Sequence, residues 1–364
     1  MKVSYKQRFE KIEAVLDTWL PKQPDSEWML RMFGPQGPPF GPKLAFPLVQ
    51  GSRDLMERGG KRWRPLLLML AAEAIGGKSA GEEALPLTPL VELPHTGSLI
   101  HDDIEDNSDE RRGKPAVHIL YGTDTALNAG SFLYFLPLAC LTEWAKNKSA
   151  VCAIENKIWA VWALQMRALH LGQAMDINWH RDHSYIPGLD EYDRMCRFKT
   201  GGLSRLAAVL GVYSGAFSFA GKQGEEIDAA SDVFGEAAEK LGVGFQILDD
   251  VKNLDTGNPG KKRGDDIVEG KKSLPVLLFL HRYPEKKDFA ARCFTAAGAA
   301  GINAPEVEEI IASLKETGVL EEARQKGLEY IRQSREVFGA PSAAGFPLDE
   351  EGRTLLAGIA DLLL

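Results

Sequence analysis

Apolar residues recur at helical spacing along most of the chain, and this pattern predicts an all-α protein. Residues 5–19 carry Phe9, Ile12, Val15 and Leu16 on one stripe of a first amphipathic helix. From residue 48 onward the same periodicity predicts helices over 48–58, 63–76, 83–106, 122–145, 150–176, 189–220, 223–253, 272–282, 305–315, 318–338 and 349–363. No stretch alternates with period two for long enough to predict a strand.

Some of these segments are apolar on more than one face, which is expected for helices in the middle of a bundle. They are residues 63–75, 132–141, 158–171 and 203–219. We therefore expect one large helical bundle around a central apolar cavity, forming a single domain over residues 1–364.

Residues 21–47 interrupt the helical pattern. Seven of the chain's 20 prolines fall in this segment, together with several glycines, so a loop is expected at this point. Trp28, Met29, Leu30, Met32 and Phe33 predict one short helical turn within the loop that docks on another part of the protein.

The composition of the 364-residue chain is that of a soluble globular protein, with 44% hydrophobic and 26% charged residues. A net charge of −8 argues against general nucleic-acid binding, and an anionic ligand would need local cations. The N-terminus lacks the apolar core of a signal peptide, and no apolar run is long enough to span a membrane. Cys140, Cys152, Cys196 and Cys293 lack metal-binding spacing, so we expect reduced cysteines and a cytoplasmic protein.

Two predicted helices end in paired carboxylates. Asp102, Asp103 and Asp106 follow one apolar run, and in a helix Asp102 and Asp106 lie one turn apart on the same face. Asp249 and Asp250 follow a second apolar run. If the two clusters face one another, they form an all-oxygen site suited to hard divalent cations, above all Mg²⁺.

The first cluster alone has a simpler interpretation. It could be a solvated acidic helix end whose charge is balanced by Arg111 and Arg112. The metal site is favoured because the same design of an apolar run and paired aspartates occurs twice.

Cationic residues accompany both clusters. Residues 59–65 place Lys61 and Arg64 after two glycines, which allow close backbone approach to a ligand, and arginine can bind phosphate bidentately. A solvated basic turn is the alternative for this segment. Lys199 precedes two further glycines, and Lys261 and Lys271 follow the second aspartate cluster in a loop that could close over a ligand.

Acidic and cationic clusters in one bundle are explained together if the ligand is a diphosphate. The carboxylates would bind Mg²⁺, which in turn binds diphosphate oxygens, while lysine and arginine neutralise the remaining charge. A diphosphate held in this way is a good leaving group. If it leaves an allylic carbon, the resulting cation must be sheltered from water in an apolar cavity.

The chain resembles the trans-isoprenyl diphosphate synthase (polyprenyl synthetase) family from about residue 48 to at least residue 282. Each matching motif is modest alone, but seven in the same order make a specific match. They are Gly-Gly-Lys-Arg-Trp-Arg-Pro at 59–65, His95 with His101-Asp102-Asp103-Ile104-Glu105-Asp106, Arg111-Arg112-Gly113-Lys114-Pro115, Gly172-Gln173 with Asp176, Lys199-Thr200, Gly244-Phe245-Gln246 with Asp249-Asp250, and Asp266 with Glu269-Gly270-Lys271 and Leu274-Pro275.

The resemblance implies an isoprenoid synthase fold and a role for each matched residue. The implied Mg²⁺ ligands are Asp102, Asp103, Asp106 and Asp249, with Asp250 supporting them. The implied isopentenyl diphosphate site is Lys61, Arg64, His95 and Arg112. The implied allylic diphosphate site is Arg111, Lys199 and Lys261, with Gln246, Gln173 and Thr200 at the reacting end. Of these, Asp102, Asp103, Asp106, Asp249, Lys199 and Arg111 would be the catalytic residues.

The implied activity is a Mg²⁺-dependent chain-elongating prenyl transfer by a homodimer. The allylic diphosphate ionises, the double bond of isopentenyl diphosphate attacks the cation, and a proton is lost to the departing pyrophosphate. Bulky residues four and five positions before the first aspartate stop chain growth in the family. Ser98 and Gly97 are small at these positions, so we expect geranylgeranyl diphosphate or a longer product, with Phe132, Tyr134 and Phe135 as a more distant floor.

The chain departs from the family pattern at two places. Asn253 stands where the second motif usually has a third aspartate, which predicts weaker metal binding there because an amide oxygen carries no charge. The segment 21–47 has no counterpart in the family. His170, His180 and His183 match no motif either, and we expect them to be core or loop residues.

Two other functions compete with chain elongation. A class I terpene cyclase shares the aspartate-rich Mg²⁺ sites but has no need of a second diphosphate site, for which Lys61, Arg64, His95 and Arg112 are present. A regulatory subunit of a heteromeric prenyltransferase would be expected to lose aspartates of the first motif, which are intact in this chain.

Overall fold

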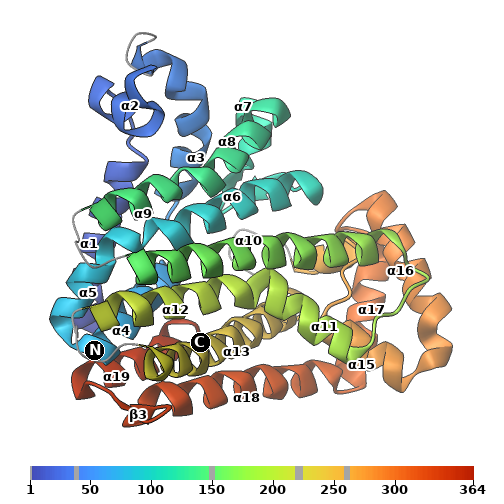
Figure 1. Cartoon of the computed structure of the whole chain (residues 1–364). Coiled ribbons are helices and arrows are strands. Elements are labelled where there is room, and N and C mark those ends of the chain that lie inside the picture. The colour runs from blue at the N-terminus through green and yellow to red at the C-terminus, as the bar shows by residue number, and fades with distance from the viewer. Residues whose placement is uncertain (1, 37–40, 147–151, 218–223, 258–262) are drawn as a thin grey trace. The chain divides into compact units, whose positions relative to one another are not determined.

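The computed structural model describes residues 2–36, 41–146, 152–217, 224–257 and 263–364. These residues are almost wholly helical, which confirms the predicted all-α class (Figure 1). The chain forms two compact units, each discontinuous in sequence. The first unit comprises Met1–Ala163, Ser204–Glu236 and Glu336–Leu364, and the second comprises Leu164–Leu203 and Ala237–Arg335. That residues 1–364 form one domain stays a prediction.

The helices, short 3₁₀ or π turns (η) and strands follow one another along the chain without a long irregular stretch among the described residues. In chain order they are α1 (Lys2–Trp19), α2 (Ser26–Phe33), η1 (Gly34–Gln36), η3 (Pro42–Ala45), α3 (Phe46–Glu57), α4 (Trp63–Gly76), α5 (Lys78–Ala84), η4 (Leu85–Leu87), α6 (Pro89–Glu105), β1 (Glu110–Arg111), β2 (Lys114–Pro115), α7 (Val117–Tyr121), α8 (Thr123–Phe135), α9 (Pro137–Lys146), α10 (Cys152–Arg181), α11 (Leu189–Cys196), η5 (Arg197–Gly201), α12 (Gly202–Phe217), α13 (Glu225–Asp255), α14 (Asp265–Val268), α15 (Leu274–Arg282), η6 (Pro284–Lys286), α16 (Lys287–Ala300), α17 (Pro305–Glu316), α18 (Val319–Gly339), β3 (Ser342–Ala343), β4 (Phe346–Pro347), α19 (Glu350–Ala357) and η7 (Gly358–Leu362).

Predicted helix boundaries fail where proline or a changed helical pitch divides a long apolar segment. The predicted helix 83–106 consists of α5, η4 and α6, because Pro86 and Pro89 cannot donate the hydrogen bonds of a continuous helix. Pro137 divides 122–145 into α8 and α9, and the π turn η5 divides 189–220. Helix α16 was not predicted. The strand pairs β1–β2 and β3–β4 are antiparallel hairpins whose strands have two residues each.

The first unit is built around α4, where almost every residue is buried. Helix α19 packs on α4, and its Leu355 carbonyl accepts a hydrogen bond from Tyr5 of α1 at 2.8 Å. The C-terminal segment is therefore a docked helix, as predicted. Helices α6 and α8 cross so closely that a Cβ on Gly97 would lie 2.6 Å from the carbonyl oxygen of Gly130.

The second unit has its own hydrophobic core. Residues of α13, α15, α16 and α17 supply most of it, with Val251, Leu277 and Phe294 all nearly inaccessible to solvent. The same face repeats along α13 at Val243 and Ile247, so the buried stripe leaves the other side of the helix for polar residues.

Segment 21–47 contains the predicted docking helix. Asp25 caps α2 by accepting a hydrogen bond from the Trp28 backbone N–H at 2.7 Å. The Trp28 indole N–H donates to the Trp19 carbonyl at 2.9 Å, and Phe33 stacks on Phe132 of α8 with ring centroids 6.2 Å apart. Helix α2 is thus fixed to α1 and α8 within the first unit.

By length and composition alone, Thr123–Lys146 is apolar enough to cross a membrane, contrary to the prediction that no segment qualifies. This is weak evidence for a span. Half of its apolar window is buried inside the protein, and core helices of soluble proteins pass the same test.

Candidate active site

The first aspartate cluster lies at the C-terminal end of α6 in the first unit. Three carboxylates there face the negative end of the helix dipole, so they need positive partners. Arg111, in the hairpin that follows, donates from Nε to Asp103 at 2.7 Å and places Nη2 3.4 Å from Asp102. Asp103 is fully buried by this pairing, whereas Asp102 and Asp106 remain partly exposed. Asp102 and Asp106 are thus the carboxylates that a bound metal could reach.

The donor chemistry at this end of α6 fits Mg²⁺ shared with a ligand. Among the described residues, no three His, Cys, Asp or Glu side chains converge into a complete metal site. Mg²⁺ does not need such a site, because it keeps several waters and is bound by one or two carboxylates together with phosphate oxygens. Two oxygen ligands from Asp102 and Asp106 suit that arrangement.

Arginine side chains surround His95, which lies in α6 of the same unit. The Arg64 guanidinium lies 3.3 Å from His95 Nε2, and Arg112 lies close enough to act on both. Burial, then Arg64 and Arg112, hold the pKa of His95 well below its ordinary value, so the ring is neutral at pH 7. Burial and neighbouring cations lower the pKa values of Arg64 and Arg112 to about 10. A bound anion would reduce the repulsion between these arginine side chains.

Glu92 is the buried carboxylate inside this arginine cluster. Arg62 donates to Glu92 at 2.9 Å, and both side chains are 3% exposed. Burial raises the pKa of Glu92, and Arg62, Arg64 and Arg112 oppose the rise. Glu92 was not singled out from the sequence, because an isolated glutamate 30 residues after Arg62 gives no local signal.

Lys61 is placed differently from the other predicted isopentenyl diphosphate residues. It is exposed, and its ammonium donates to the Leu363 carbonyl at 3.3 Å. Gly60, beside it, lies so close to the Arg112 guanidinium that a Cβ would sit 3.0 Å from Nη2. The structure therefore brings Arg64, His95 and Arg112 together and leaves Lys61 at the C-terminal segment.

The second aspartate cluster lies near the end of α13, in the second unit. Asp249 is exposed, but Asp250 is buried with both oxygens engaged, by Tyr192 at 2.9 Å and by Gln246 Nε2 at 2.8 Å. Thr200 extends this network by donating to Gln246 Oε1 at 2.9 Å. Burial and the nearby Asp266 raise the pKa of Asp250. Asp250 thus holds Gln246 and Thr200 in place, and its support of a metal ion stays a prediction.

Asn253 is held by hydrogen bonds to the turn before α14. The side chain is buried, and its oxygen accepts a hydrogen bond from the Asp266 backbone N–H at 3.3 Å. Its backbone carbonyl accepts from Gly264 N–H at 3.0 Å. Asn253 thus anchors the turn before α14, and weaker metal binding at this position stays a prediction.

Lys199 is presented by a π turn, a local widening of the helix that is rare and often found at functional sites. Gly172 of α10 permits this, since a Cβ there would lie 2.9 Å from Phe198 Cβ. The Lys199 ammonium donates to Asp176 at 2.6 Å. Gln173, next to Gly172, is partly exposed on the same helix. Lys261 lies outside the described residues.

Some of the residues predicted to set the product length have different surroundings from those expected from the sequence. Gly97 has no room beside it, because the α8 backbone occupies the space, so its small size serves helix packing and not an open tunnel. Ser98 is partly exposed and donates to the His95 carbonyl at 2.8 Å. Phe135 is 67% exposed and cannot form an internal floor, whereas Tyr134 is buried beside His101.

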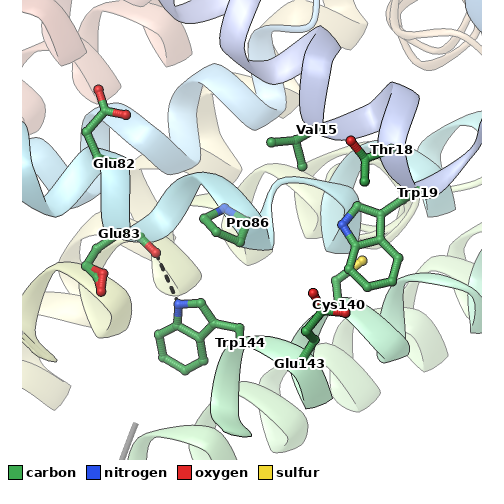
Figure 2. A pocket seen from close by; sticks show the side chains of 9 residues that line it. All are labelled: Val15, Thr18, Trp19, Glu82, Glu83, Pro86, Cys140, Glu143 and Trp144. Carbon is green, nitrogen blue, oxygen red and sulfur yellow. Dashed lines mark hydrogen bonds between the residues drawn. The ribbon is translucent and has the colours of Figure 1, made fainter. Parts of the chain in front are cut away.

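A cavity of about 330 Å³ lies elsewhere in the first unit (Figure 2). It is lined from α1, α5, η4 and α9, and Figure 2 shows Trp19 and Trp144 at its walls. None of the predicted site residues lines it. The Arg31 guanidinium of α2 lies 5.1 Å from the centroid of the Trp19 ring, and its Nε lies 3.5 Å from the Glu143 carboxylate. Helix α2 therefore contacts two of the residues that line this cavity.

The chain is similar to known proteins along most of its length. Residues 47–312 match the polyprenyl synthetase family. The chain is 36% identical over 270 residues to the short chain isoprenyl diphosphate synthase of Methanocaldococcus jannaschii, covering 74% of this chain and 76% of that protein. It is 32% identical over 325 residues to the geranylfarnesyl diphosphate synthase of Aeropyrum pernix, covering 87% and 93%.

Solved structures show the same fold. A geranylgeranyl pyrophosphate synthase from Corynebacterium glutamicum, solved with isoprenyl diphosphate and magnesium, superposes with a TM-score of 0.78. The comparison covers 96% of each chain at 23% sequence identity.

Proposed function

The chain belongs to the polyprenyl synthetase family and is a chain-elongating prenyltransferase, and we propose that it condenses an allylic diphosphate with isopentenyl diphosphate using Mg²⁺. The observation that carries the two-substrate proposal is the arginine cluster around neutral His95. Burial and then Arg112 lower the pKa of Arg64, while burial and then Arg62 and Arg111 lower the pKa of Arg112. A multiply charged anion stabilises such an environment.

The residues of each unit divide the chemistry as follows. In the first unit, Arg64, Arg112 and His95 bind isopentenyl diphosphate, with Lys61 an outer contributor. The allylic substrate is bound by Arg111 of the first unit and by residues of the second unit, namely Lys199, Lys261, Gln173, Thr200 and Gln246. Lysine acts on the diphosphate as a point charge, whereas arginine binds two oxygens at once.

Mg²⁺ would be held by Asp102, Asp106 and Asp249, the aspartates whose carboxylates remain at least partly exposed. Asp103 and Asp250 support them by fixing Arg111 and Gln246. When bound, Mg²⁺ supplies charge neutralisation of the leaving diphosphate. The Corynebacterium glutamicum enzyme was solved with magnesium, which supports the choice of a divalent metal and does not bear on the individual aspartates.

We propose geranylgeranyl diphosphate or a longer product. The support is the small, partly exposed Ser98 one turn before Asp102, since a turn rises about 5.4 Å along the helix. The Aeropyrum pernix relative, a geranylfarnesyl diphosphate synthase, is consistent with a product of this size.

The division between the two diphosphate sites is tested by paired substitutions. Arg64→Ala should raise the Michaelis constant for isopentenyl diphosphate about ten- to a hundredfold, as expected for loss of a charged hydrogen bond, and Lys199→Ala should do the same for the allylic substrate. Steady-state kinetics with each substrate varied in turn measures both constants. Arg205→Ala, at a partly exposed arginine of α12, is the control and should change neither. Equal effects of Arg64→Ala on both substrates would refute the division.

A homodimer is supported by exposed apolar side chains on neighbouring helices of the first unit. Ile119 and Leu120 of α7 are 56% and 47% exposed, and Leu127 and Phe135 of α8 are 52% and 67% exposed. Exposed apolar groups gathered in this way mark association surfaces. Light scattering should give twice the chain mass, and Phe135→Asp should shift it toward the monomer while Leu164→Asp does not. A monomeric wild-type protein would end this proposal.

A cytoplasmic location is supported by Cys140, Cys196 and Cys293, which are buried free thiols. Fractionation of cells expressing the protein tests it, and recovery of the enzyme in a membrane or secreted fraction would contradict it.

A further inference from the structure

Asp176 of α10 is bound by two basic side chains, one on each carboxylate oxygen. Lys199 of the π turn donates to Oδ2 at 2.6 Å. His180, one helical turn further along α10, places Nε2 2.7 Å from Oδ1. A carboxylate only accepts hydrogen bonds, so the hydrogen of His180 is assigned to Nε2.

This arrangement is buried and electrostatically strong. The side chains of Asp176 and His180 are 8% and 10% exposed, and that of Lys199 is 20% exposed. Burial alone would raise the pKa of Asp176, but Lys199, His180 and the nearby Lys271 outweigh it and hold the pKa below its ordinary value. Asp176 is therefore an anion at every pH at which the enzyme works, and both of its oxygens have a defined partner.

The backbone around the three side chains leaves little freedom. Gly172 packs α10 against the π turn that carries Lys199, and Gly270 packs against the backbone carbonyl of His180, where a Cβ would lie 3.2 Å from that oxygen. The flexible element that remains is the lysine stem, whose ammonium has three donors and can rotate among partners. Asp176 Oδ2 takes one of these donors.

We propose that His180 is a positioning residue for Lys199. By holding Oδ1 of Asp176, it aims Oδ2 at the lysine and fixes the ammonium in the orientation that receives the allylic diphosphate. The inference rests on the proposed role of Lys199 in binding that substrate. The i, i+4 spacing of Asp176 and His180 was visible in the sequence, but only the structure shows that Lys199 shares the same carboxylate.

Substitutions of different reach test this inference. His180→Leu removes the donor, and His180→Asn is too short to reach Oδ1. Both should lower kcat/KM for the allylic substrate about three- to tenfold, the scale of one ordinary hydrogen bond, because the effect reaches the substrate only through Lys199. Both should leave kcat/KM for isopentenyl diphosphate unchanged. His180→Gln keeps a donor within reach and should stay within about twofold of wild type. His170→Leu, on the same helix, is the matched control and should have no effect.

A double-mutant cycle separates positioning from a general structural role. In a Lys199→Ala background, His180→Leu should cause no further loss, because the group that it positions is gone. If the two losses multiply, His180 acts on structure and the inference is wrong. It is also wrong if Lys199→Ala impairs the allylic substrate but none of the His180 variants does. If Lys199→Ala itself has no effect, the proposed function of Lys199 fails and the inference falls with it.

Discussion

Asp102→Asn should lower turnover by about two to three orders of magnitude, the scale on which loss of charge stabilisation at a leaving group acts. The substitution keeps the size of the side chain and removes one negative charge from the last turn of α6. Asp102 is partly exposed and only weakly engaged by Arg111, at 3.4 Å, so the fold should tolerate the change. Initial rates of pyrophosphate release at saturating Mg²⁺ measure the effect.

Asp103→Asn should cause a comparable loss by another route. Asp103 is fully buried and accepts a hydrogen bond from Arg111, so neutralising it releases the arginine that we propose binds the allylic diphosphate. Asp109→Asn, at an exposed aspartate before the β1–β2 hairpin, provides the matched control and should retain normal turnover. Near-normal activity of both the Asp102 and Asp103 variants would show that the α6 aspartates do not carry the chemistry.

Glu92→Gln should lower the free energy of unfolding by about 3–5 kcal/mol, the usual cost of breaking a buried ion pair from one side. The glutamine leaves Arg62, 3% exposed, next to Arg64 and Arg112 with the half-exposed Glu13, at 2.7 Å, as its remaining carboxylate partner among the described residues. Urea denaturation followed by far-ultraviolet circular dichroism gives the change in free energy. Added pyrophosphate should recover part of the loss, because an anion that binds only the folded state stabilises it.

The control for this prediction is Glu57→Gln, at a surface pair with Arg53 whose glutamate side chain is 39% exposed. Surface ion pairs contribute about 0–1 kcal/mol, so this variant should unfold almost as the wild type does. If Glu92→Gln costs no more than Glu57→Gln, the arginine cluster does not depend on an internal counter-charge and the electrostatic account of this site is wrong.

The periodic pattern predicted the all-α class and most helices, because burial of an apolar stripe is a local property of the sequence. It failed at Pro137 and at the π turn around Lys199, where a local break interrupts an otherwise continuous apolar segment. It also suggested a false reason for the glycine at position 97, since small residues look alike whether they border a cavity or a neighbouring backbone.

The candidate site residues were predicted by motif, but their contacts were not. Asp102 and Asp103 are adjacent in sequence, but Asp103 is buried against Arg111 and Asp102 is partly accessible. The β1–β2 hairpin, which carries Arg111, causes this difference. The hydrogen bond that Asn253 accepts from the Asp266 backbone could not be predicted from the motif. Contacts between distant segments decide such roles, and spacing within one helix cannot report them.

The most direct test of the central claim is product analysis with purified wild-type protein, labelled isopentenyl diphosphate in excess and an allylic primer. With Mg²⁺ present, the account predicts linear prenyl diphosphates of geranylgeranyl length or longer, one pyrophosphate released for each unit added, and no product when the metal is removed by a chelator. A cyclised hydrocarbon formed without uptake of isopentenyl diphosphate, or no product at all, would contradict chain elongation. A product that stops at farnesyl diphosphate would contradict the chain length proposed from Ser98.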